Sequence, residues 1–152
     1  MRRAAFLMAE SAPYEAMLEF SELLGLPVAY NPRCNRIAKA RGFWPLKSIE
    51  VGDSWFELDY DERMAVLLHE AGHALKWDAE VRLLLIPIFW TKFAVRIVHR
   101  QELAADAFAV SNGYGVQLLR FLSRFRNVDP GEHHPNYFVR ARNIHRLLKE
   151  SR

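Results

Sequence analysis

The sequence predicts an α+β domain in which a small three-stranded sheet packs beside one long helix and further helices complete the core. Two observations lead to this prediction. Three short β-prone segments lie between residues 26 and 51, separated by glycine and proline, and apolar residues recur at helical spacing in the segments after residue 60. With 152 residues, 51% of them hydrophobic and 26% charged, the chain is expected to form a single domain over residues 1–152.

The first third of the chain is expected to supply one helix and the sheet. Ser11 and Pro13 open a segment with apolar residues at helical spacing, and Gly25 follows it as a stop signal. Three strands are then expected, over residues 26–30, 36–41 and 46–51. The single cysteine, Cys34, cannot form an internal disulfide, so a reduced, cytoplasmic environment is expected.

The remaining chain is expected to be helical. Asp59 and Glu62 have the spacing of a capping box and predict a helix over residues 61–77. The apolar stretch 81–98 contains three cations and Pro87, so it lacks the ~18 uncharged residues of a membrane span. We expect it to connect two helices and either to cover a cleft or to rest on a membrane surface. Further helices are expected over residues 99–110, 116–126 and 136–149.

The pattern His-Glu-x-x-His occurs at residues 69–73, inside the predicted helix 61–77. Residues four apart lie on the same side of a helix, so the imidazoles of His69 and His73 can converge on one metal ion. Glu70 can then take a proton from a metal-bound water, which is the general-base role in metallopeptidases with this motif. The pattern therefore predicts a zinc site, because zinc is commonly bound by histidine.

A catalytic zinc site usually has three protein ligands, and the predicted helix 99–110 offers two candidates for the third. Glu102 and His99 are three residues apart and could both face the metal. Glu102 is favoured because Asp106 follows one turn later and could orient a ligating imidazole, whereas His99 lies at the expected start of the helix. The apolar side of this helix is expected at Leu103, Ala107 and Val110.

These motifs, together with His134-Pro135 and the downstream Arg140, resemble the gluzincin zinc peptidases of the HtpX and CAAX prenyl protease family. The resemblance extends from about residue 46 to the C-terminal helix. It implies that Glu102 is the third zinc ligand and that the strand over 46–51 lines the cleft and pairs with extended substrate. It also implies that His134 and Arg140 support the site, although Arg142 is nearly as well placed as Arg140.

The expected activity is hydrolysis of peptide bonds in a protein or peptide substrate, with zinc as the cofactor. Two alternatives stay open. The chain could be a non-catalytic adaptor or nucleic-acid-associated protein, or a latent enzyme whose N-terminal helix or residues 81–98 cover the cleft. Nucleic-acid binding is not expected, because the arginines after residue 119 alternate with apolar residues as on a solvated helix face. Peripheral membrane contact through residues 81–98 is the further expectation.

Overall fold

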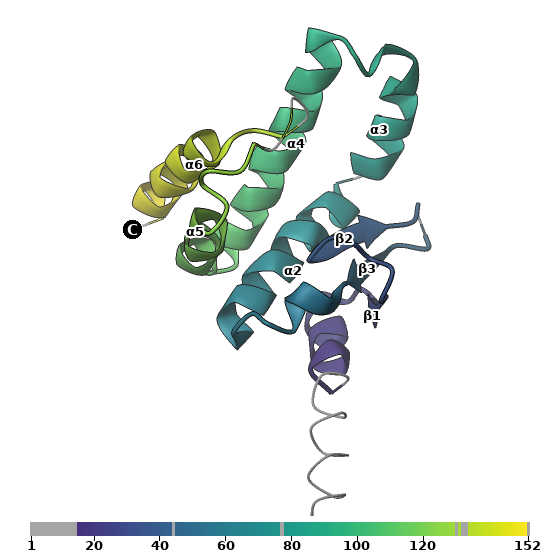
Figure 1. The fold of residues 1–152 in the computed structure, drawn as a ribbon, viewed down its shortest axis with the longest axis vertical. Helices are drawn as coiled ribbons and strands as arrows, with labels where there is room; N and C mark the ends of the chain where they lie inside the picture. Colours follow the sequence, from purple (N-terminus) through teal and green to yellow (C-terminus); the bar gives the residue numbers. More distant parts are fainter. Residues whose placement is uncertain (1–14, 44, 77, 130, 132–133, 152) are drawn as a thin grey trace, which may run out of the picture.

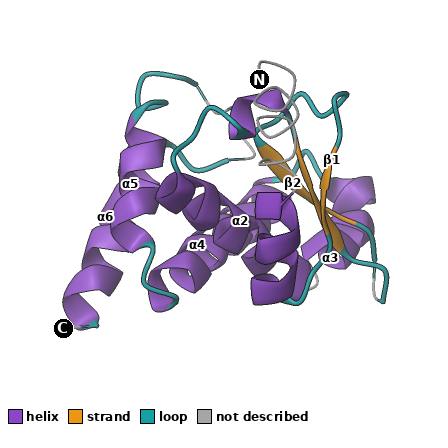
Figure 2. Cartoon of the chain, turned by 90° about the horizontal axis from the view of Figure 1, so that it is seen from below, coloured by secondary structure: helices purple, strands orange, loops and turns teal. Residues whose placement is uncertain are grey.

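The computed structural model describes residues 15–43, 45–76, 78–129, 131 and 134–151. Within these residues the fold is α+β, as the sequence predicts, with a small sheet beside a group of helices (Figures 1 and 2). The N-terminal helical segment is described over residues 15–24, and Gly25 ends it with φ +62°, a conformation that favours glycine. Residues 11–14 of the predicted helix lie outside the described residues.

The sheet has the strand order β1-β3-β2, with β1 parallel and β2 antiparallel to β3. The strands span Val28–Tyr30 (β1), Ala38–Arg41 (β2) and Ser48–Val51 (β3). β3 is central, and the side chains of Ile49 and Val51 are fully buried. The expectation that the strand over 46–51 pairs with substrate is therefore wrong, because both of its edges are already hydrogen-bonded. In the described part of the chain, β2 offers an edge with no neighbouring strand.

Helix α2 (Tyr60–Leu75) carries the His-Glu-x-x-His pattern and begins at the predicted N-cap. The side chain of Asp59 accepts a hydrogen bond from the backbone N–H of Glu62 at 2.8 Å. The carboxylate of Glu62 does not complete a capping box: it is fully buried and pairs with Arg120 and Arg124 at α5 (Gly115–Ser123). These ion pairs fasten α5 to the start of α2.

Residues 81–98 form the two arms of a helical hairpin, so the expectation of a connecting segment is wrong. α3 (Asp78–Leu85) leads through a short 3-10 turn, η2 (Ile86–Ile88), into α4 (Lys92–Ser111). Pro87 lies in the first turn of η2, where its missing N–H costs nothing, and Thr91 caps α4 by accepting from the N–H of Ala94. The start of α4 at residue 92 places His99 inside the helix rather than at its frayed end.

The buried side of α4 agrees with the prediction at Val110 but not at the other two predicted residues. It runs through Ala94, Val98, Ala105 and Ala109, whereas Leu103 and Ala107 are only half-buried. Small residues along this side let α4 lie close to α2. The final helix, α6 (Tyr137–Glu150), is capped by Asn136 and packs on α4 and α5. Among the described helices, none combines the length and the apolar character needed to cross a bilayer.

Gly72 lies at a close contact between α2 and α4. A Cβ atom at this position would lie 2.9 Å from the Cα of Ala105 and 3.1 Å from the Cβ of Phe108. The first of these is a backbone atom and cannot move aside alone. Because Gly72 lies between the two histidines of the motif, its contact sets the distance from α2 to the helix that carries Glu102.

We expect Gly72→Ala to lower the free energy of unfolding by about 2 kcal/mol, the usual range for overpacking a core. Denaturant unfolding measures this change. In a helix interior alanine is intrinsically more favourable than glycine by roughly 1 kcal/mol. A loss of stability in Gly72→Ala would therefore come from the close packing of the two helices and not from helix propensity. A more stable Gly72→Ala variant would show that α2 and α4 do not approach as closely as described.

Candidate metal centre

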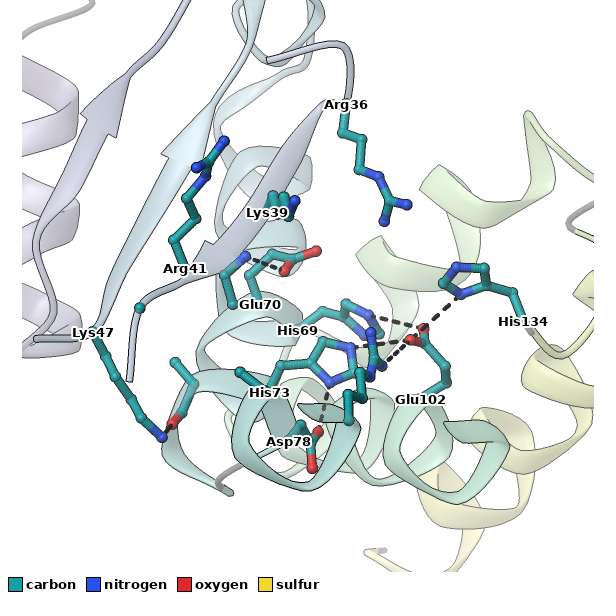
Figure 3. Close-up of a pocket in the computed structure, with 15 residues that line it drawn as sticks. Arg36, Lys39, Arg41, Lys47, His69, Glu70, His73, Asp78, Glu102 and His134 are labelled. Atoms are coloured by element: carbon teal, nitrogen blue, oxygen red, sulfur yellow. Dashed lines mark hydrogen bonds and ion pairs between the residues drawn. The ribbon is translucent and has the colours of Figure 1, made fainter. Parts of the chain in front are cut away.

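Two imidazoles and one carboxylate converge between α2 and α4. One ligand atom each from His69, His73 and Glu102 can be chosen so that all three lie within 4.8 Å of one another, and all three residues are buried. The Nε2 atoms of His69 and His73 lie 3.6 and 3.4 Å from the two carboxylate oxygens of Glu102 (Figure 3). This group can hold a metal ion, because nitrogen and oxygen donors from three side chains face one point.

The other ring nitrogen of each histidine is bonded to an aspartate. His69 Nδ1 lies 2.9 Å from the carboxylate of Asp106, and His73 Nδ1 lies 2.7 Å from that of Asp78. A carboxylate that accepts a hydrogen bond from the N–H at Nδ1 keeps the proton on that nitrogen. The lone pair of Nε2 is then free to bind a metal. When a metal is bound, these contacts would hold both imidazoles in the neutral tautomer that directs the Nε2 lone pair to the metal.

Asp106 is in turn held by Arg140 of α6. The guanidinium binds the fully buried carboxylate through two hydrogen bonds, of 2.6 and 2.9 Å. Burial by itself raises the pKa of Asp106, but Arg140 and His69 outweigh burial and lower it. The neighbouring candidate Arg142 is exposed and borders a separate surface hollow. The structure therefore brings Arg140, and not Arg142, to the site.

Glu102 has two further partners besides the histidines of α2. Arg82 of α3 donates to its carboxylate at 2.9 Å, and His134 Nδ1 lies 3.4 Å from the same oxygen. Burial raises the pKa of Glu102, but its contacts with His134, His69 and His73 hold that pKa far below its usual range. Burial lowers the pKa of His69, but its hydrogen bonds to Asp106 and Glu102 outweigh this and raise it to about 9.

The electrostatics of this group are compatible with a bound cation, in addition to the guanidinium groups of Arg82 and Arg140 that face Glu102 and Asp106. Three carboxylates, those of Asp78, Glu102 and Asp106, are buried around the two imidazoles. Buried carboxylates are stable only when positive charge or hydrogen-bond donors face them. A divalent cation at the Nε2 side would supply that charge with both imidazoles neutral.

Glu70 lies beside this group, at the edge of the sheet. Its carboxylate accepts a hydrogen bond of 2.7 Å from the backbone N–H of Ala40 in β2 (Figure 3). The cleft in front of it has a volume of about 210 Å³. It is lined by the three candidate ligands and Glu70, by β2, and by Asp78 and Arg82 of α3. Glu70 thus joins the candidate metal group to an open strand edge.

A second pocket opens from the same residues toward α5. It has a volume of about 500 Å³ and reaches the candidate ligands His69 and Glu102 at one end. Its other walls are mainly apolar and come from β2, α2, α5 and the segments around them: Ile37, Ala38, Val66, Leu118, Phe121, Leu122, Phe125 and Pro135. An apolar chamber therefore adjoins the group that can hold a metal.

Sequence reasoning missed Asp78 and Arg82. α3 starts at Asp78, and the carboxylate of this residue lies beside Nδ1 of His73, five residues earlier. Arg82 lies one turn further along α3 and reaches Glu102 and Gln101. The local signal that could have indicated these two residues is an aspartate just beyond the motif helix, followed by an arginine four residues later.

The other histidines and the cysteine are placed elsewhere. His99 is half-buried on α4 and His145 is exposed on α6; neither joins the described group of ligands. His133 lies outside the described residues. Cys34 is half-buried, and its thiol donates to the backbone carbonyl of Arg36.

Comparisons of the chain with models of known protein families, with curated proteins and with solved structures gave no match.

Proposed function

We propose that this protein is a zinc-dependent endopeptidase, a small relative of the HtpX and CAAX prenyl protease family that its motifs resemble. One observation carries the proposal. His69, His73 and Glu102 converge in a buried group, and Glu70 stands next to that group at an open strand edge. A site that only stabilises the fold has no need of an acid beside its ligands, facing a cleft.

Zinc fits the donor set better than the other common metals. Two neutral imidazoles and one carboxylate are typical of catalytic zinc sites, whereas calcium and magnesium prefer oxygen ligands alone. The described partners of the Nδ1 atoms, Asp106 and Asp78, are those expected around ligating histidines. When bound, zinc would polarise the scissile carbonyl and lower the pKa of a coordinated water toward ~7.

Glu70 is the proposed general base and proton carrier. Its carboxylate would accept a proton from the attacking water and deliver it to the nitrogen of the leaving amine. The hydrogen bond from the N–H of Ala40 fixes one oxygen of this carboxylate. The orientation of the base is thereby coupled to strand β2, the part of the sheet that would meet substrate.

An extended peptide is the proposed substrate form. The outer edge of β2 pairs with no strand among the described residues. Glu70 occupies the N–H of Ala40, and the other outward backbone groups of β2 would bind an extended peptide. Substrate bound along this edge would pass in front of the candidate ligands. The apolar chamber beside Phe121 would then receive an apolar side chain close to the scissile bond.

The test is cleavage of a mixed peptide library by the purified, zinc-loaded protein, with products identified by mass spectrometry. We expect cuts next to apolar residues, loss of cleavage with a zinc chelator, and recovery on adding zinc back. Phe121→Ala should enlarge the chamber and shift the preference toward larger apolar residues by about tenfold, the scale of a single pocket contact. Phe138→Ala, an exposed aromatic on α6, is the matched control. Failure of the zinc-loaded protein to cut any peptide would contradict the proposal.

A further inference from the structure

The hairpin of α3, η2 and the start of α4 projects from the fold (Figure 1). Its end carries exposed apolar side chains. We call residues 83–93 the hairpin tip. The most exposed apolar residues there are Leu84 (79%), Trp90 (78%), Phe93 (61%) and Ile86 (59%). Large apolar side chains gathered at one end of a molecule usually mark an interaction surface.

The hairpin tip is also set in a wholly basic segment. From Val81 to Gln101 the chain contains no aspartate or glutamate, but it contains Arg82, Lys92, Arg96 and Arg100. Lys92, Arg96 and Arg100 are exposed. Within the described part of the chain, no ion pair is formed by these three residues. Their charges are therefore available to an anionic partner.

The tip is a projection and not a groove. Of residues 81–98, Arg82 lines the cleft, whereas residues 83–98 line neither the cleft nor the apolar chamber. A second copy of this chain would bring the same cations against the tip and be repelled. A projecting group of leucine, isoleucine, phenylalanine and tryptophan flanked by lysine and arginine has instead the composition of surface-bound membrane segments.

We propose that the hairpin tip inserts into the surface of a bilayer containing anionic lipids. The side chains of Leu84, Ile86, Trp90 and Phe93 would enter the headgroup and acyl boundary. Lys92 and Arg96 would contact the anionic headgroups. Asp78 lies six residues before Leu84 on α3, about 9 Å along the helix axis, so binding would hold the candidate metal centre close to the lipid surface.

Flotation of the full chain with lipid vesicles tests this proposal. We expect the protein to float with phosphatidylglycerol–phosphatidylcholine vesicles and to stay behind with phosphatidylcholine alone, and we expect salt to weaken the binding. Trp90→Ser combined with Phe93→Ser should reduce binding at least about tenfold, because it removes two large apolar side chains from the contact. Lys92→Glu combined with Arg96→Glu should do the same through charge.

Phe138→Ser is the matched control, since this side chain is 66% exposed on α6 and lies outside the hairpin tip. It should bind vesicles like the wild type. All the changed residues are exposed, and circular dichroism checks that the variants are folded. The proposal is overturned if the wild type fails to float with anionic vesicles, or if it binds neutral vesicles equally well. It is also overturned if the Trp90 and Phe93 changes leave vesicle binding unchanged. None of these results depends on peptidase activity.

Discussion

Glu70→Gln should retain zinc and lose peptide hydrolysis by at least about 10³-fold, within the range for removal of a general base. The amide keeps a carbonyl oxygen that can accept the hydrogen bond from Ala40, so the geometry of the cleft should be preserved. Glutamine cannot take the proton of the attacking water at neutral pH. Metal content, measured by mass spectrometry, and the rate of peptide cleavage are compared for the two proteins.

Glu22→Gln is the control for this experiment, because Glu22 is exposed on the N-terminal helical segment, outside the residues that line the cleft. Its zinc content and cleavage rate should equal those of the wild type. Cleavage by Glu70→Gln at the wild-type rate would eliminate Glu70 as the base. Loss of zinc from Glu70→Gln would instead make Glu70 part of the metal site.

Glu102→Ala should weaken zinc binding more than about 100-fold, beyond the range seen when a supporting residue is lost. It should also destabilise the fold by roughly 3 kcal/mol, because Arg82 and the two histidines of α2 lose a buried anionic partner. Zinc titration and thermal unfolding measure the two effects. Glu102→Gln, which keeps the shape of the side chain, should fold and still bind zinc weakly.

His99→Ala is the matched comparison on the same helix. His99 is half-buried three residues before Glu102 and lies outside the candidate ligand group. The variant should keep both its zinc and its melting temperature near the wild-type values. If His99→Ala emptied the site while Glu102→Ala stayed loaded with zinc, the ligand assignment would be wrong.

The sequence predicts the local features of this fold well. The start of α2 at Asp59 and the His69–His73 spacing depend on neighbours within one or two helical turns. The spacing of Glu102 and Asp106 is equally local, and the structure brings these four site residues together. Each of these spacings can be recognised in the sequence because both of its residues lie on the same helix.

The features that the sequence did not predict depend on contacts distant in the chain. The central place of β3 follows from pairing with two strands, and nothing in residues 48–51 distinguishes a central from an edge strand of this short sheet. The contact of Asp78 with His73 depends on how the chain turns between α2 and α3. The hairpin was missed because an apolar segment interrupted by Pro87 resembles a connector more than two helices.

X-ray absorption at the zinc edge of the wild-type protein tests the proposed metal site, because it identifies the atoms around the metal. We predict one zinc ion per chain with nitrogen and oxygen ligands at about 2.0–2.1 Å and the multiple scattering of two imidazoles. These ligands would be His69, His73, Glu102 and a water molecule. A spectrum without two imidazoles, or one with a sulfur ligand at about 2.3 Å from Cys34, would contradict the proposed zinc site.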